Sequence, residues 1–120
     1  KIETICEIGR SRQVYLVRPI PTMRDSIPNF MLKQHAKGEV SDYKITKANY
    51  LKANAVTISL QDAAAKMCGA KIIDITQSLC DQNFCYGTVD NVPIYADNNH
   101  LTERGSKLLV ADFREQLNNL

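Results

Sequence analysis

The chain has 120 residues, which is enough for one domain, or part of one, with a modest core. Its hydrophobic fraction of 44% and charged fraction of 23% are ordinary for a soluble globular protein, and its net charge of +2 argues against nucleic acid or an anionic membrane as a partner. No apolar run approaches the roughly 20 residues that span a bilayer, and the polar start at Lys1 is not a signal peptide.

The first part of the chain predicts a helix followed by a buried strand. Residues 2–9 carry one apolar helical face. Residues 13–18 are apolar on both faces, which is typical of a central parallel strand covered by helices, and two prolines end this strand. The loop over residues 20–25 therefore follows the carboxyl end of a strand, where α/β proteins bind ligands. A rigid connector is the alternative interpretation of that loop.

A second helix is expected over residues 26–37. Ser26 can cap it, Pro28 lies in its first turn and Gly38 ends it. His35 lies on this helix without an acid or a cysteine nearby, so we interpret it as a structural histidine rather than a ligand.

The pattern of one long helix then runs over residues 46–68. Gly69 ends this helix, and residues 71–75 predict a second buried strand whose Asp74 bonds nearby backbone. A strand, a helical crossover and a strand form a βαβ unit, so the sequence predicts an α/β fold. The residues expected to form the buried stripe of the long helix are Ala53, Val56, Thr57, Leu60, Ala63, Ala64 and Met67.

The last third combines irregular chain with a C-terminal helix. Residues 78–80 predict a short helical turn, and residues 81–91 predict a surface loop. A helix over residues 102–118 would hold the preceding loop against the body of the fold. Its expected inner face consists of Leu101, Gly105, Leu108, Leu109, Phe113, Leu117 and Leu120.

Asp97 and His100 lie three residues apart, just before this last helix. Asp97 can accept a hydrogen bond from one ring nitrogen of His100, which fixes the tautomer and stabilises the imidazolium, while the other nitrogen can take a proton from a hydroxyl nucleophile. The pair therefore predicts the base and the orienting acid of a serine hydrolase or acyl-transfer site. A helix-capping cluster is the alternative, with Asp97, Asn99 or Thr102 accepting the first free amides of the helix.

The four cysteines indicate whether the protein lies in an oxidising or a reducing compartment. Cys80 and Cys85 flank a short polar loop that a local disulfide could close, which favours an oxidising compartment such as the periplasm. Two free thiols are one alternative, and a metal site that uses both cysteines with Asp97 or His100 is another. Zinc sites usually contain a second closely spaced pair of cysteines, which this spacing lacks. Cys6 and Cys68 lie on apolar helical faces, and we interpret them as small buried hydrophobes.

The residues Leu79-Cys80, Cys85, and the run from Pro93 through Tyr95, Asp97 and His100 to Gly105 resemble the C-terminal end of an SGNH (GDSL-type) hydrolase domain. The likeness is strongest to the domain fused to bacterial acyltransferase-3 membrane proteins, which O-acylate surface polysaccharides. Ile94 and Thr102 stand where leucine and serine are usual in that family. The run from Val14 to Pro21 also looks like the strand and Pro-x-Pro exit of such a domain.

This resemblance implies that residues 1–120 are a single domain, the C-terminal portion of a three-layer, flavodoxin-like fold with a parallel sheet flanked by helices. It implies catalytic roles for Asp97 and His100, with no cofactor and no metal. The family's Gly-Asp-Ser block, which carries the nucleophile, and its Gly-x-Asn-Asp block are absent. The sequence Arg24-Asp25-Ser26 lacks the glycine and follows the wrong strand. We therefore expect the nucleophile to lie upstream of Lys1 and this chain alone to be inactive.

The implied reaction is O-acylation, such as O-acetylation, or deacylation of a cell-surface glycan such as lipopolysaccharide. Its substrates would be an acyl donor and a glycan acceptor, at the periplasmic face of the bacterial inner membrane. The expected partners are the upstream half of the domain and the membrane domain of the same protein. With only two predicted strands, the chain should associate with that half or with itself. The alternative function is a non-catalytic module of the same fold that binds glycan or a partner.

Overall fold

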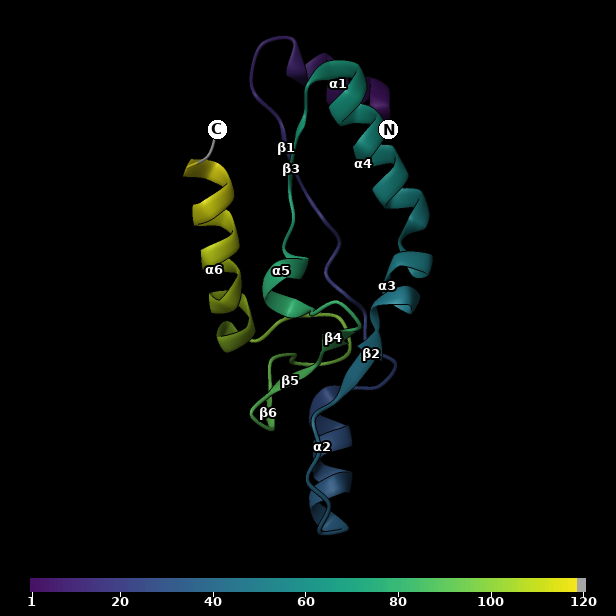
Figure 1. The fold of residues 1–120 in the computed structure, drawn as a ribbon, viewed down its shortest axis with the longest axis vertical. Coiled ribbons are helices and arrows are strands. Elements are labelled where there is room, and N and C mark those ends of the chain that lie inside the picture. The colour runs from purple at the N-terminus through teal and green to yellow at the C-terminus, as the bar shows by residue number, and fades with distance from the viewer. Residues whose placement is uncertain (119–120) are drawn as a thin grey trace.

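The computed structural model describes residues 1–118, so the predicted inner-face residue Leu120 lies outside the described part of the chain. The molecule is elongated, measuring 56 × 27 × 23 Å (Figure 1). In chain order the elements are α1 (Ile2–Gly9), β1 (Tyr15–Val17), α2 (Ile27–Ala36), β2 (Lys44–Thr46), α3 (Lys47–Ala53), α4 (Ala55–Cys68), β3 (Lys71–Ile73), α5 (Thr76–Leu79), β4 (Phe84–Tyr86), β5 (Thr88–Val89), β6 (Val92–Pro93) and α6 (Glu103–Asn118).

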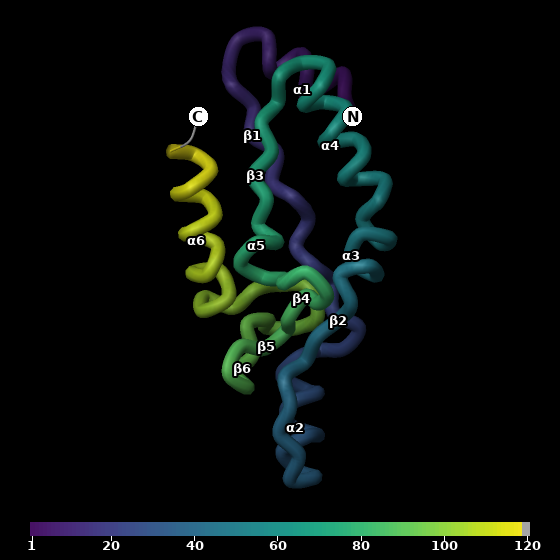
Figure 2. The backbone as a smooth tube through the Cα atoms, viewed as in Figure 1, coloured from purple at the N-terminus to yellow at the C-terminus, as the bar shows by residue number. Residues whose placement is uncertain are grey.

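Strands β1 and β3 form a parallel pair, with Leu16 opposite Ile72. This confirms the α/β class and the predicted parallel pairing of the two apolar strands. Helices α4 and α6 lie on either side of the pair (Figure 2). Within residues 1–118, β3 is the only strand beside β1, and Tyr15 and Val17 remain exposed, so the cover over β1 is incomplete in this part of the domain.

Two further sheets were not predicted. Strands β2 and β4 pair antiparallel, and so do β5 and β6. Asp90 and Asn91 join β5 to β6 with positive φ angles of 52° and 61°, as a tight two-residue hairpin requires. The segment predicted as a surface loop therefore contains strands, each only two or three residues long.

The predicted long helix is two helices. Asn54 separates α3 from α4 with φ −108° and ψ 11°, and its side-chain amide donates to the carbonyl of Tyr50 at 2.9 Å. An asparagine offers the backbone such a local alternative to the helical hydrogen bond. Strand β2 also takes up Thr46, which we expected in the first turn of that helix.

Helix α4 packs on a different face from the predicted stripe. Ala64 is buried as expected, but Val56 and Met67 are 76% and 69% exposed. The helix instead turns a polar residue towards β1, because Gln61 donates to the carbonyl of Val17 at 2.8 Å and accepts from Arg18 at 3.0 Å. The spacing of apolar residues thus identified a real stripe, but most of its side chains face solvent.

The core lies in the middle of the molecule, where the connections between elements converge. Two buried tyrosines anchor the proline connection after β1: the hydroxyl of Tyr50 donates to the carbonyl of Pro19 at 2.9 Å, and that of Tyr95 donates to the carbonyl of Pro21 at 2.6 Å. The buried apolar cluster consists of Met23, Ile27, Tyr43, Ile45, Tyr50, Ile73, Ile75, Leu79, Cys85, Ile94 and Tyr95.

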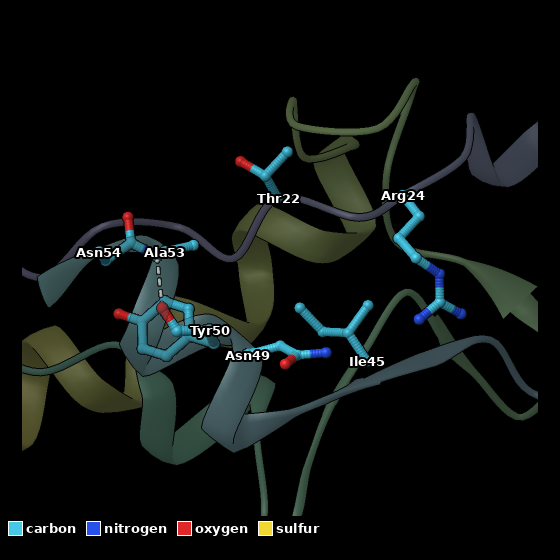
Figure 3. Close-up of a pocket in the computed structure, with 7 residues that line it drawn as sticks. All are labelled: Thr22, Arg24, Ile45, Asn49, Tyr50, Ala53 and Asn54. Carbon is cyan, nitrogen blue, oxygen red and sulfur yellow. Dashed lines mark hydrogen bonds between the residues drawn. The ribbon is translucent and has the colours of Figure 1, made fainter.

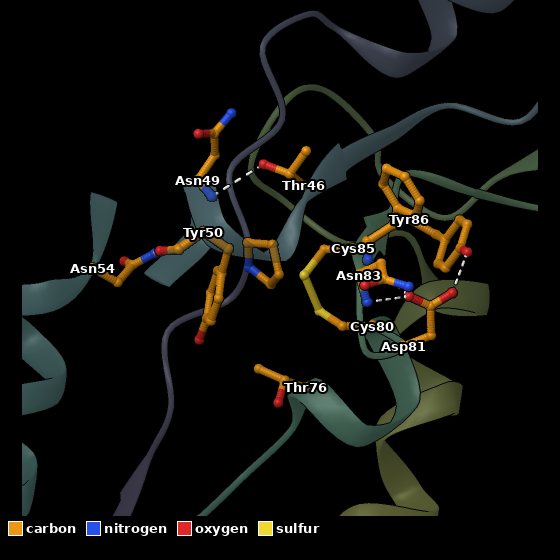
Figure 4. The surroundings of a disulfide bond; sticks show 12 residues. Thr46, Asn49, Tyr50, Asn54, Thr76, Cys80, Asp81, Asn83, Cys85 and Tyr86 are labelled. Carbon is orange, nitrogen blue, oxygen red and sulfur yellow. Dashed lines mark hydrogen bonds between the residues drawn. A yellow bond between two sulfur atoms is a disulfide. The ribbon is translucent and has the colours of Figure 1, made fainter. Parts of the chain in front are cut away.

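All four cysteines form disulfides. The predicted bond between Cys80 and Cys85 is confirmed (Figure 4). The interpretation of Cys6 and Cys68 as separate buried hydrophobes is wrong, since they form a second disulfide that joins α1 to α4. Helix α1 has no buried residue, so this bond is a principal attachment of the helix.

Helix α2 projects away from the rest of the molecule (Figure 1). Pro28 lies in its first turn and Gly38, with φ +71°, follows its end as predicted. Ser26 occupies the N-cap position, but its side chain makes no capping hydrogen bond. His35 is exposed. No helix in residues 1–118 combines the length and apolarity needed to cross a bilayer.

Candidate active site

The loop between β6 and α6 folds back on itself and presents Asp97 and His100 at its tip. The N–H of Ala96 donates to the carbonyl of His100 at 2.7 Å, and the N–H of Thr102 donates to the carbonyl of Ile94 at 3.0 Å. Ile94 and Tyr95, at the base of the loop, are buried. The tip is therefore held by its own backbone and by the core beneath it.

The carboxylate of Asp97 joins the loop backbone to the imidazole. Its Oδ1 accepts the backbone N–H groups of Asn99 at 2.8 Å and of His100 at 2.7 Å, and its Oδ2 lies 2.8 Å from Nδ1 of His100. These backbone N–H groups and then the imidazole stabilise the charged form, which lowers the pKa of Asp97 to about 2. An ionised Asp97 can only accept a hydrogen bond, so in the neutral ring the proton lies on Nδ1.

The imidazole faces outwards. The side chain of His100 is 76% exposed and that of Asp97 is 45% exposed. Within residues 1–118, Nε2 of His100 has no hydrogen-bond partner. A ring with this tautomer leaves the lone pair of Nε2 free to accept a proton from a hydroxyl that approaches from outside the loop.

The capping alternative applies to Thr102 and not to Asp97. The hydroxyl of Thr102 accepts the N–H of Gly105 at 3.0 Å, in the first turn of α6. Asp97 binds N–H groups before the helix starts, and so it organises the loop rather than the helix. The capping residue and the acid–base pair are thus separate features of the same loop.

Helix α6 fixes the position of this loop. Gly105 lies so close to Ile94 that a Cβ atom at this position would overlap the carbonyl oxygen of Ile94. Near its other end, Gln116 exchanges two hydrogen bonds with the backbone of Asp74, at 2.7 and 2.9 Å. Of the other predicted inner-face residues, Leu108, Leu109 and Phe113 pack against the core, whereas Leu117 is exposed.

The connection after β1 lies against the Asp97 loop. The N–H of Met23 donates to the carbonyl of Asn98 at 2.7 Å, and the N–H of Ile27 donates to the carbonyl of Asp97 at 3.1 Å. Ser26 lies in this connection, but no hydrogen bond joins it to His100 in the described part of the chain. Ser26 is therefore not placed as a nucleophile here.

A cavity of about 250 Å³ opens beside this connection (Figure 3). Thr22 and Arg24 line it from the connection, and Asn49, Tyr50 and Asn54 line it from α3 and the break after it. The prediction that residues 20–25 border a groove agrees with this cavity. The residues of α3 were not predicted to line it, and the available signal was a pair of asparagines within a supposed helix, where asparagine is unfavourable.

The hypothesis of a metal site at Cys80, Cys85 and His100 is wrong, because both sulfur atoms are held in a disulfide. Asp74 bonds locally, as predicted: its Oδ1 accepts the N–H and the hydroxyl of Thr76 at 2.9 and 2.6 Å. Among residues 1–118, no cluster of three or more histidine, cysteine or acidic side chains is placed to hold a metal ion.

Comparison with known proteins identifies relatives over nearly the whole chain. The model of the family described as "SGNH domain (fused to AT3 domains)" matches residues 2–115. The fold is similar to that of the periplasmic domain of the Salmonella ser. Paratyphi A lipopolysaccharide acetyltransferase, with a TM-score of 0.66 and 17% sequence identity. That similarity covers 97% of this chain but 46% of the Salmonella chain, so this chain spans about half the length of its structural neighbour. No curated protein matches the sequence.

Proposed function

Because the chain belongs to the family of SGNH domains fused to AT3 domains, we propose that Asp97 and His100 are the acid–base half of a Ser-His-Asp site for O-acyl transfer or ester hydrolysis. The observation that carries this proposal is the 2.8 Å contact between Asp97 and Nδ1 of an exposed imidazole whose Nε2 has no partner in residues 1–118. This is the arrangement that a general base needs before its substrate arrives.

In the proposed reaction, Nε2 of His100 takes the proton of a serine hydroxyl as the serine oxygen attacks the carbonyl carbon of an ester. The resulting imidazolium gives that proton to the leaving alcohol, and an acyl-serine remains. His100 then deprotonates either water or a sugar hydroxyl, which attacks the acyl-serine, and the proton returns to the serine. Asp97 stays ionised throughout, since its pKa of about 2 lies far below neutrality.

The serine is proposed to come from another part of the same domain. The chain contains no Gly-Asp-Ser block, and no serine hydroxyl bonds His100 in residues 1–118. The structural neighbour is about twice as long, which leaves room for a second half that carries the nucleophile and the oxyanion hole. This chain would then be the C-terminal portion of the domain, inactive by itself, with the other half and a membrane domain of the same protein as its partners.

The proposed substrates are an acyl donor, such as an acetyl donor, and a cell-surface glycan acceptor, such as lipopolysaccharide. The structural neighbour is the periplasmic domain of a lipopolysaccharide acetyltransferase, which supports both the reaction class and a periplasmic location. Two disulfides support the same location, because they persist in oxidising compartments. We place the domain at the periplasmic face of the bacterial inner membrane.

The proposal is tested by two substitutions in the complete protein. Asp97→Asn and His100→Ala should each lower the rate of O-acyl transfer by about 10³–10⁴-fold, because the base loses its orienting acid or is absent. Both side chains are exposed, so the thermal unfolding of the variants should stay close to that of the wild type. His35→Ala, which removes the other histidine of the chain, is the matched control and should keep full activity.

Near-normal transfer by His100→Ala would refute the catalytic proposal. In that case the non-catalytic alternative, a module that binds the glycan or the membrane domain, would be favoured.

A further inference from the structure

The cavity beside the connection after β1 contains polar groups that the fold does not use. Within residues 1–118, the hydroxyl of Thr22, the guanidinium of Arg24 and the side-chain amide of Asn49 make no hydrogen bond. All three line the same space (Figure 3). Hydroxyl and amide groups both donate and accept, and so they complement the hydroxyl groups of a sugar.

The frame of this cavity is rigid. Tyr50 is 2% exposed, and its hydroxyl is bonded to Pro19 at 2.9 Å. Asn49 is fixed at the start of α3, because its N–H donates to the hydroxyl of Thr46 at 3.1 Å. The guanidinium of Arg24 lies 5.8 Å from the centre of the Tyr43 ring, in cation–π range. The backbone that carries Asn49 and the ring of Tyr50 are therefore held in place before a ligand arrives.

The charge of the cavity selects its ligand. Arg24 is the single charged residue among those that line it, and no carboxylate of residues 1–118 pairs with it. The adjacent Asp25 is engaged elsewhere, since its Oδ2 accepts the hydroxyl of Tyr43 at 2.8 Å. An unpaired guanidinium favours a carboxylate or phosphate, which it can bind through two parallel hydrogen bonds. The volume of about 250 Å³ suits one sugar ring and not a longer oligosaccharide.

The connection that lines the cavity with Thr22 and Arg24 also supports the loop that carries Asp97 and His100. Arg24 follows Met23, whose N–H is bonded to the carbonyl of Asn98, and Ile27 is bonded in the same way to Asp97. A ligand held by Arg24 is therefore positioned by the same piece of backbone that supports the loop of His100.

We propose that this cavity is a subsite for an anionic sugar residue of the glycan acceptor, bound by Arg24 through its acidic group and by Thr22 and Asn49 through its hydroxyl groups. The role as an acceptor subsite rests on the proposed acyl transfer, whereas binding of the sugar does not.

Binding is measured on the complete protein by isothermal titration calorimetry with D-glucuronate, D-glucose and inorganic phosphate. We expect glucuronate to bind about tenfold more tightly than glucose, because a hydrogen-bonded charge pair adds to the shared hydroxyl contacts. Arg24→Gln should remove that tenfold difference, and Asn49→Ala should weaken glucuronate without weakening phosphate. Lys66→Gln, which removes an exposed positive charge from α4, is the matched control and should leave all three affinities unchanged.

Equal affinities for glucuronate and glucose, or no effect of Arg24→Gln, would overturn the proposal. Phosphate that binds as tightly as glucuronate would reduce the cavity to a simple anion site and would also overturn it. His100→Ala separates this proposal from the proposed function: it should abolish transfer and leave glucuronate binding intact. If His100→Ala keeps transfer while Arg24→Gln loses glucuronate, the subsite stands and the catalytic proposal fails.

Discussion

The carboxylate of Asp97 has two tasks at once. One oxygen organises the loop by accepting two backbone N–H groups, and the other orients the imidazole. The backbone bonds to Asn99 and His100 limit rotation of the carboxylate, and they therefore help it to hold the imidazole in one orientation. The backbone bonds are also the largest cause of the lowered pKa of Asp97, so its ionisation reports directly on the order of the loop.

This leads to a pH prediction. The pKa of Asp97 is about 2 in the folded chain and about 3.9 in an unfolded one. Because the folded pKa is the lower of the two, ionisation of Asp97 stabilises the fold above about pH 4, and this contribution is lost as the pH falls to about 2. The effect should be small, since the pair is exposed to solvent. Urea unfolding should therefore separate wild type from Asp97→Asn slightly at pH 6 and not at all near pH 2.

A carbon-13 titration of the Asp97 carboxyl checks the cause. A measured pKa near 4 would mean that the amide bonds of the loop are not formed in solution. Asp81, whose pKa is lowered by the hydroxyl of Tyr86 and by two backbone N–H groups of its own loop, is an internal comparison in the same spectrum.

At the scale of elements, the two disulfides differ in what they hold. The bond between Cys6 and Cys68 closes a separation of 62 residues and attaches a helix that buries no side chain. The bond between Cys80 and Cys85 closes a separation of five residues, and Cys85 lies in β4 as part of the packed core (Figure 4). The first bond should therefore restrict the unfolded chain far more than the second.

Replacing Cys6 and Cys68 by serine should lower the free energy of unfolding by about 4 kcal/mol, against about 2 kcal/mol for Cys80 and Cys85, from the chain entropy of the two loops. Denaturant unfolding of the two double variants measures the difference. Amide hydrogen exchange should show α1 opening in the first variant while α6 stays protected. Equal losses of stability in the two variants would contradict this account.

Some elements of the fold could be predicted from the sequence, and others could not. The local i, i+3 contact of Asp97 with His100 was predicted because it depends on a few neighbouring residues. The strands β2, β4, β5 and β6 were missed because two or three residues are too few for an alternating pattern. The cavity was only half predicted, since the tertiary fold brings Asn49 to the same cavity as Arg24 and Asn54 interrupts what looks like one helix.

Burial of α4 was predicted on the wrong face for a related reason. Apolar periodicity locates a stripe, but it does not say what covers the stripe. In residues 1–118, the polar contacts of Gln61 and Arg18 fix the helix against β1 and leave Val56 and Met67 exposed.

The catalytic role of Asp97 and His100 remains a prediction.

At the scale of the whole molecule, the chain is more extended than its length implies. A compact chain of 120 residues has a radius of gyration of about 14 Å, whereas that of this chain is 16.4 Å. Exposed apolar side chains gather on α4, at Val56, Leu60 and Met67, and on β1, at Tyr15 and Val17. Apolar surface of this kind favours association.

We therefore expect the chain to associate, either with the other half of its domain or with a second copy of itself. Sedimentation velocity over a wide range of concentrations should show a sedimentation coefficient that rises with concentration. A triple variant, Val56→Ser, Leu60→Ser and Met67→Gln, should weaken the association, whereas Lys66→Ser on the same helix should not. A chain that stays monomeric at every concentration would disprove this expectation.

The close contact between Gly105 and Ile94 has a consequence for protein engineering. Anyone who transplants this histidine and its aspartate onto another scaffold must also transplant the bare α-carbon five residues further on. A single methyl group there would push the helix away from the turn, and the ring would then point in a new direction. Gly105 is thus needed to hold the imidazole of His100 in its orientation.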